Sequence, residues 1–165
     1  MAVKYYDWLD QHESIRPSKI AVHDVDTGVK TSYAQLNNRA KKLAAYLQEK
    51  GIQKGDRVAL LVRNCTAFFE VQFACSKIGA ICLPLNWRLT SNELAYILGD
   101  STPSLMVYDY VFAETAEPLG QSCDIGHLLE VREPGEDSSF EQAIDHDFEV
   151  APVTSTHDDV CKIMY

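Results

Sequence analysis

The segment SKIGAICLPLNWRLTSNELAYILG, residues Ser76–Gly99, decides the fold, because it holds the end of one helix, a buried strand, a loop and the start of a second helix. Residues 81–85 form an almost uninterrupted apolar run, which is typical of a strand that is covered on both faces and belongs to a parallel sheet. Thr90 and Glu93 have the spacing of a capping box, which predicts that a helix begins there. Gly99 is expected to end this helix in the left-handed conformation.

Strands are predicted at a regular interval along the chain. Apolar runs begin near residues 58, 81, 105 and 127, which are separated by 23, 24 and 22 residues. This interval is close to the length of a strand, a crossover helix and two connections, so it indicates successive βαβ units. Right-handed crossovers place the helices on both faces of the sheet. The sequence therefore predicts an α/β fold with three layers and a mostly parallel, doubly wound sheet.

Further elements are predicted from apolar spacing and capping pairs. Near the amino end they are a short helix from Tyr5 that ends before Pro17, and a small hairpin. The hairpin has a strand over 20–22, a turn at Asp26–Gly28 and a second strand through Thr31. The later elements are a helix that begins with Ser32 and Gln35 and ends at Gly51, a crossover helix over Phe68–Ile78, a weaker helix over Phe112–Leu119, a helix that begins with Ser138 and Glu141 and ends near Asp145, and a last strand over Val160–Tyr165. A chain of 165 residues can bury roughly 70% of its unfolded surface, so residues 1–165 are expected to form a single domain.

The composition restricts the function classes. Hydrophobic residues make up 46% and charged residues 24% of the chain, which are ordinary globular values. The net charge of −9 arises in residues 130–159, where ten acids face Arg132 alone, so no nucleic-acid partner is expected and the acidic segment is interpreted as solvated surface. No secretory leader opens the chain, and no apolar run approaches the roughly 20 residues of a membrane helix. We therefore expect a soluble, cytoplasmic protein without a transmembrane segment.

Cysteine and histidine patterns do not predict a metal or nucleophile site. The cysteines are Cys65, Cys75, Cys82, Cys123 and Cys161, and the histidines are His12, His23, His127, His146 and His157. The odd number of cysteines without a C-x-x-C pair favours reduced core thiols in a reducing compartment. The histidines have no metal-ligand spacing, and the cluster His157–Asp159 is interpreted as a polar turn. Neither G-x-G-x-x-G, G-x-x-x-x-G-K-[ST] nor G-x-S-x-G occurs in the chain.

The opening segment also resembles a known enzyme family. Its pattern K-x-G-A-x-x-x-P-L-N-x-R-L-T-x-x-E-L-x-Y-I-L, from Lys77 to Leu98, is similar to that of the AMP-forming acyl-CoA ligases of the adenylate-forming superfamily. Residues 31–36 resemble an early S/T-Y-x-x-L element of that family, and residues 158–165 resemble the strand that leads to its phosphate loop. The resemblance runs from about Tyr5 to Tyr165.

This resemblance implies a ligase that uses ATP, Mg²⁺ and CoA, in which an acyl-adenylate forms and the CoA thiol then displaces AMP. In the family, the phosphate loop with its lysine follows the position of Tyr165, and the nucleotide motifs and a carboxy-terminal domain lie further on. The chain is therefore expected to correspond to the amino-terminal part of an adenylation domain. It is expected to have no catalytic residue, to bind no cofactor and to be inactive alone, with the remainder of that domain as its partner.

Several alternatives stay open at this point. The residues from Asn86 to Leu98, N-W-R-L-T-S-N-E-L-A-Y-I-L, favour a fatty-acyl or aryl CoA ligase, with a long-chain fatty-acid ligase as the preferred reading, over a luciferase-like ligase or a peptide-synthetase adenylation domain. An alternative from another class is a binding or assembly module without catalysis. Such a module would dock through its sheet edge or through residues 163–165, and this exposed apolar end also invites self-association.

Arg88 is the one candidate binding residue. Asn86, Trp87 and Arg88 follow the carboxyl end of a predicted parallel strand, the edge where open α/β sheets collect ligands. The resemblance implies that Arg88 lies near the CoA phosphates, for which its planar guanidinium is suited. The alternative is that Arg88 pairs with a helix-start carboxylate such as Glu93. Trp87 is expected to pack the loop rather than to form a wall of an acyl pocket.

Overall fold

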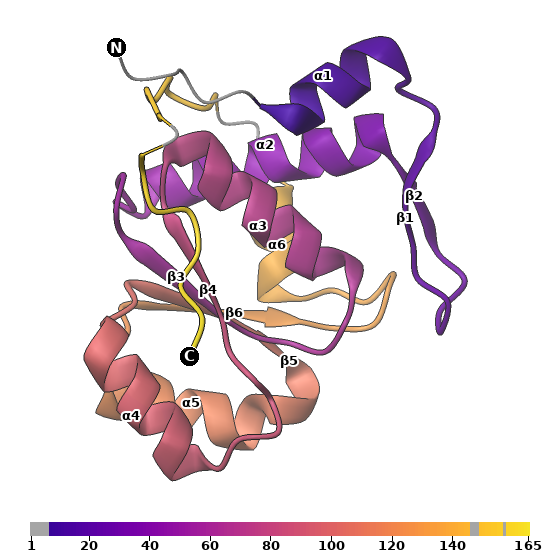
Figure 1. The fold of residues 1–165 in the computed structure, drawn as a ribbon. Helices are drawn as coiled ribbons and strands as arrows, with labels where there is room; N and C mark the ends of the chain where they lie inside the picture. The colour runs from indigo at the N-terminus through magenta and orange to yellow at the C-terminus, as the bar shows by residue number, and fades with distance from the viewer. Residues whose placement is uncertain (1–6, 146–148, 157) are drawn as a thin grey trace.

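A parallel sheet forms the centre of the computed structural model, which describes residues 7–145, 149–156 and 158–165 (Figure 1). Its strands are β3 (Arg57–Leu61), β4 (Ile81–Pro84), β5 (Leu105–Asp109) and β6 (His127–Val131). They lie in the order β4-β3-β5-β6, and all three neighbouring pairs are parallel. The predicted succession of βαβ units is confirmed.

Helices cover both faces of this sheet, as predicted. The helices α2 (Tyr33–Glu49), α3 (Thr66–Ile78) and α6 (Ser139–Ile144) lie on one face, and α4 (Ser91–Ser101) and α5 (Ala113–Ser122) lie on the other (Figure 1). Strand β3 shows why both faces form, because Val58 and Leu60 pack into the first apolar layer and Ala59 and Leu61 into the second. The continuous apolar run of this strand reflects burial on both sides.

The amino-terminal region adds a helix and a hairpin beside the helical layer. The helix is α1 (Trp8–Ile15), and the hairpin consists of β1 (Ile20–His23) and β2 (Lys30–Ser32), which pair in antiparallel fashion. Helix α1 packs on α2 through the buried Leu9, and the side chain of Asp7 caps it. The predicted hairpin is confirmed, whereas the predicted helix start at Tyr5 lies outside the described residues.

Two of the three predicted capping boxes are present. Ser32 with Gln35 begins α2, and Thr90 with Glu93 begins α4, with reciprocal hydrogen bonds in both cases. The third is half formed: Ser138 accepts a hydrogen bond from the backbone N–H of Glu141. The carboxylate of Glu141 turns away to Arg39 on α2, because a charged partner across the helix interface binds it more strongly than a backbone N–H.

The prediction that Gly99 ends its helix was wrong. Helix α4 continues to Ser101, and Thr102 takes the left-handed conformation with a φ of 43°. The guanidinium of Arg57 donates hydrogen bonds of 2.7 Å to the carbonyl oxygens of Ser101 and Thr102. These bonds satisfy carbonyl groups at the helix end, so the helix is stabilised beyond its glycine.

The predicted last strand over Val160–Tyr165 is reduced to one parallel bridge, between Cys82 and Lys162. Two backbone hydrogen bonds hold it, from Cys82 N to Cys161 O at 3.0 Å and from Ile163 N to Cys82 O at 3.1 Å. Side chains on either side of the bridge contact other segments. Asp159 binds Lys54, and the hydroxyl of Tyr165 donates to Asp100 on α4.

Candidate functional site

The carboxyl edge of the sheet contains a cavity at its topological switch point. The chain leaves β3 toward β4 and leaves the adjacent β5 toward β6, so the two connections diverge above the same pair of strands. Ligands of open α/β sheets bind at such points. The cavity has a volume of about 350 Å³ and is lined by the loops after β3, β5 and β6 together with the hairpin.

An ion pair joins the two divergent loops on the floor of this cavity. Arg63 follows β3 and donates a hydrogen bond of 2.7 Å from Nε to Oδ2 of Asp109, the last residue of β5. Asp109 is buried, and its second oxygen accepts from the backbone N–H of Val111. The hydrogen bond to Asp109 raises the pKa of Arg63, and Glu133 lies 3.6 Å from the same guanidinium. The positive charge of Arg63 is therefore compensated by these two carboxylates.

A second ion cluster forms one wall of the cavity. Arg39 on α2 binds Glu70 on α3 and Glu141 on α6, with a shortest distance of 2.6 Å to each carboxylate. Burial raises the pKa of Glu70, although Arg39 opposes the shift. The cluster fastens three helices to one another, and Arg39 uses its Nε, Nη1 and Nη2 groups in these pairs.

Arg88 lies in the loop after β4, at the same edge of the sheet. The side chain of Asn86 accepts a hydrogen bond of 3.1 Å from the backbone N–H of Arg88, and the carbonyl oxygen of Asn86 accepts one of 3.0 Å from Leu89. These bonds fix the backbone in a tight turn. The guanidinium carbon of Arg88 lies 4.1 Å from the centroid of the Trp87 ring, which places the cation on an aromatic surface.

The alternative pairing of Arg88 with Glu93 was wrong. The carboxylate of Glu93 accepts hydrogen bonds of 2.8 Å from the backbone N–H and the hydroxyl of Thr90, so the helix cap occupies it. No carboxylate of the described residues lies within ion-pair distance of Arg88. Trp87 does pack the loop, because its ring stacks on Phe112 with 6.0 Å between centroids, but it remains 38% exposed.

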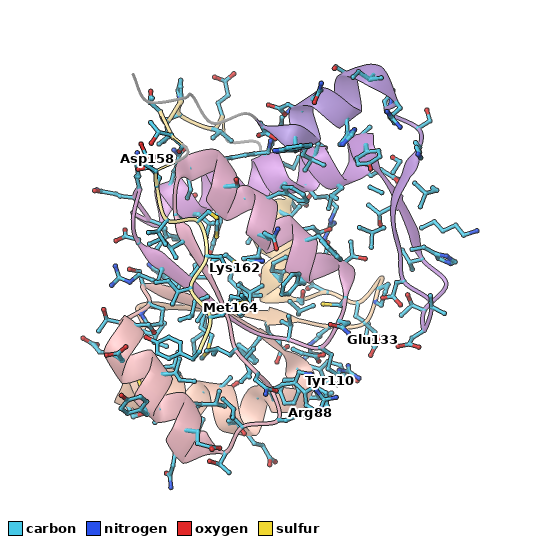
Figure 2. The ribbon with its side chains drawn as sticks, viewed as in Figure 1. Arg88, Tyr110, Glu133, Asp158, Lys162 and Met164 are labelled. Carbon is cyan, nitrogen blue, oxygen red and sulfur yellow. The ribbon has the colours of Figure 1, made fainter. Side chains whose placement is uncertain are left out.

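Figure 2 shows Arg88, Tyr110 and Glu133 along the same edge of the molecule. A series of contacts connects them. Trp87, which contacts Arg88, stacks on Phe112 of the 3₁₀ turn Tyr110–Phe112. Asp109 precedes this turn and binds Arg63, whose guanidinium lies 3.6 Å from Glu133. Sequence reasoning found Arg88 but not the cavity or its ion pairs. The sequence signal for the ion pair was that Arg63 and Asp109 lie at the carboxyl ends of two predicted strands.

The other candidate ligands do not form a site. Among the described residues, no three of the histidines, cysteines, aspartates and glutamates converge as a metal site would require. Asp159 closes a turn by accepting from Thr156, while His146 and His157 lie outside the described residues. All five cysteines are free thiols, and Cys75 and Cys82 are buried as expected, but Cys161 is exposed, which contradicts a core position.

The described residues do not fit ATP with Mg²⁺. Phosphate-binding loops offer a run of backbone N–H groups, usually from glycines, and Mg²⁺ needs oxygen ligands beside them. The glycines at the helix and strand ends serve turns, such as Gly51 and Gly55 with positive φ, and the acids near the carboxyl edge are engaged by arginines. Separately, no helix in the described part of the chain has the length and apolar character to cross a membrane.

Comparisons with known proteins agree with this architecture. A feruloyl-CoA synthase of Amycolatopsis sp is 35% identical over 158 residues, which cover 96% of this chain and 30% of that protein. The long-chain-fatty-acid–CoA ligase FadD13 of Mycobacterium tuberculosis is 34% identical over 123 residues, which cover 74% of this chain and 24% of the relative. The chain thus spans about three tenths or less of the length of these relatives.

Solved structures show the same fold. The N-terminal domain of FACL13 from Mycobacterium tuberculosis superimposes with a TM-score of 0.83 at 29% identity, covering 95% of this chain and 40% of that one. An anthranilate CoA ligase, AuaEII, gives a TM-score of 0.86 at 23% identity over 98% of this chain and 31% of that one, which supports the fold alone. The family model described as AMP-binding enzyme matches residues 9–165, so the chain belongs to the AMP-binding enzyme family.

Proposed function

We propose that this chain is the amino-terminal part of the adenylation domain of an AMP-forming acyl-CoA ligase, which joins a carboxylic acid to CoA and converts ATP to AMP and pyrophosphate. The family match and the similarity to CoA ligases support this reaction class. The observation that carries the proposal is Arg88, a cation without an ion-pair partner among the described residues, in the loop after β4.

Arg88 is proposed to contact the 3′-phosphate of CoA. A guanidinium can offer two parallel N–H groups to phosphate oxygens, and such charge-assisted bonds are stronger than neutral ones. Arg39 and Arg63 already bind carboxylates, whereas Arg88 pairs with none of the described residues, and this contrast favours Arg88 as the contact. When bound in the parent enzyme, ATP with Mg²⁺ would supply the adenylyl group that activates the carboxylic acid, with pyrophosphate as the leaving group. We propose that the groups that hold it lie outside this chain.

The isolated chain is therefore proposed to be catalytically inactive. An ATP–pyrophosphate exchange assay with the purified 165-residue protein and a panel of acids tests this directly. We expect exchange at the level of a protein-free control, and exchange above that level would refute the proposal of inactivity. We propose a long-chain fatty acid as the substrate of the parent enzyme, from the P-L-N-W-R-L-T segment, with an aryl acid as the rival.

The role of Arg88 has its own test. Binding of CoA and of dephospho-CoA, which lacks the 3′-phosphate, can be compared by NMR titration of the wild type and of Arg88→Gln. We expect the wild type to prefer CoA by about tenfold, as charge-assisted hydrogen bonds to one phosphate provide, and Arg88→Gln to lose this preference. Equal affinities of the wild type for the two ligands would refute the proposed contact.

A second candidate function is assembly with another polypeptide. The side chains of Val160, Met164 and Tyr165 are more than half exposed along a segment that is joined to β4 by a single bridge. We propose that the remainder of an adenylation domain covers this surface and that the separate chain self-associates through it. Light scattering should detect a dimer or larger species, and a monomer at high concentration would refute self-association.

The free thiols support our further proposal of a reducing, cytoplasmic location.

A further inference from the structure

Arg88, Trp87 and Phe112 form a stack of three side chains from two different loops. The guanidinium carbon of Arg88 lies 4.1 Å from the centroid of the Trp87 ring. Trp87 also stacks on Phe112, with 6.0 Å between the ring centroids and an angle of 26° between the ring planes. Trp87 belongs to the loop after β4 and Phe112 to the turn after β5, so the stack bridges β3, which lies between these strands.

We propose that Trp87, supported by Phe112, is a positioning residue that holds the Arg88 guanidinium ready for the 3′-phosphate of CoA. This inference rests on the proposed function, because it concerns the same phosphate contact. Trp87 itself makes no bond to the phosphate in this proposal. It acts through the orientation of its neighbour.

The geometry of a guanidinium allows both interactions at once. Its N–H groups lie in the plane of the group, whereas contact with an aromatic ring uses its face. Arg88 can therefore stay on Trp87 while its edge donates hydrogen bonds. A long arginine side chain loses rotamer freedom when it binds a ligand. The stack orders part of the side chain beforehand and so reduces the entropic cost of binding.

The neighbouring backbone supports the same arrangement. Asn86 accepts a hydrogen bond of 3.1 Å from the backbone N–H of Arg88, which fixes the start of the side chain. Glu93, the nearest acidic residue along the helix, is held by Thr90 at 2.8 Å. The cation is thus oriented by a turn and by a ring, without a carboxylate that a phosphate would have to displace.

A purely structural role for the stack makes a different prediction. If Trp87 only packs the loop against Phe112, its loss would change stability, and any change in affinity would be the same for ligands with and without the phosphate. A positioning role changes the affinity for the phosphate-bearing ligand alone. It also changes the mobility of the Arg88 side chain before any ligand is present.

The experiment uses the full 165-residue chain with ¹⁵N-labelled arginine. CoA and dephospho-CoA are titrated into the wild type, Trp87→Leu, Trp87→Phe, Phe112→Leu and Arg88→Gln, and the heteronuclear NOE of the Arg88 Nε–H is measured without ligand. We expect Trp87→Leu to lower the preference for CoA over dephospho-CoA by about two- to fivefold, the loss of one exposed cation–π contact. Trp87→Phe should keep the preference within about twofold, because a ring remains.

The mobility measurement should agree with the titrations. The Nε–H of Arg88 should be ordered in the wild type and in Trp87→Phe and mobile in Trp87→Leu. Phe112→Leu should show the same change to a smaller extent, and it replaces Trp87→Leu as the test if that variant does not fold.

The outcomes separate the two proposals. If Arg88→Gln loses the preference for CoA and Trp87→Leu retains it in full, the positioning role is overturned and the phosphate contact stands. If the wild type binds both ligands equally, or neither, both proposals are overturned. If Trp87→Leu weakens both ligands to the same extent, the stack has only a structural role.

Discussion

Replacement of Arg39 by methionine is predicted to destabilise the fold more than loss of an exposed ion pair does. Arg39 binds Glu70 through two contacts, Nε to Oε1 at 2.6 Å and Nη2 to Oε2 at 3.3 Å. The side chain of Glu70 is 2% exposed, so its charge depends on Arg39 for compensation. Methionine preserves the helix propensity of α2 and much of the side-chain volume, which isolates the loss of charge.

The magnitude follows from burial. Removal of one partner from a buried ion pair costs about 3–5 kcal/mol, because the other charge is left without compensation. The Arg39 side chain is 29% exposed, so water can reach part of the vacated site and the lower limit applies. With an m-value of about 2 kcal/mol per M, a loss of about 3 kcal/mol lowers the urea midpoint by about 1.5 M. The assay is urea denaturation followed by circular dichroism.

The pH dependence of this loss has a definite sign. Burial raises the pKa of Glu70 above its unfolded value, and removal of Arg39 removes the interaction that opposes the shift. The penalty of the ionised carboxylate is fully present above the folded pKa and disappears as the pH falls toward the unfolded pKa of about 4.3. Arg39→Met should therefore be more destabilising, relative to the wild type, at pH 8 than at pH 5.

Two controls complete the test. Arg132→Met removes an exposed pair with Glu130 and should change the midpoint little. Arg39→Met combined with Glu70→Leu should recover much of the stability, because no charge remains buried. The reasoning is refuted if Arg39→Met and Arg132→Met have equal effects, or if the loss is the same at both pH values.

Three further predictions concern backbone conformation and thiol exposure. Gly99→Ala should raise the unfolding free energy by about 0.5–1 kcal/mol in the same urea assay, because Gly99 lies inside α4 with open space at its Cβ position. A destabilised variant would contradict the placement of Gly99 inside the helix. Gly79→Ala should lower it by about 1–2 kcal/mol, since its φ is +71° and a Cβ would lie 2.9 Å from Lys54; a neutral result would contradict this conformation. Cys161 should react quickly with DTNB at pH 8, and Cys82, whose pKa burial raises to about 11, only after unfolding. Mass spectrometry would identify the modified thiol, and early labelling of Cys82 would contradict its burial.

The main elements were predictable because their signals are local. Apolar runs of about five residues gave the strands, and a capping pair gave the start of α2 and of α4. The end of α4 was not predictable from its own residues. It depends on Arg57, which is 44 residues away in sequence and donates to the carbonyl oxygen of Ser101. The last strand was predicted over six residues, and only one parallel bridge forms, between Cys82 and Lys162.

The cavity was beyond sequence reasoning because distant segments build it. Arg39 and Glu141 are 102 residues apart, and Arg63 and Asp109 are 46 residues apart. No spacing rule connects such pairs. The position of Arg88, in contrast, followed from a general property of parallel sheets, since the loop after a strand reaches the ligand-binding edge whatever lies elsewhere.

The environment of Arg88 also shows how two local rules constrain each other. The sequence offered Glu93 both as the carboxylate of a capping box and as a partner for Arg88. The structure gives this carboxylate to Thr90, whose N–H and hydroxyl both lie at 2.8 Å. A capping carboxylate is fixed at the helix start and competes poorly for a cation outside it, so a strong capping signal is itself an argument against the ion pair. Applied together, the two rules predict from sequence that Arg88 is left for a ligand, which makes Glu93→Ala a useful variant: it removes the capping side chain, so it should weaken α4 and leave the CoA preference unchanged.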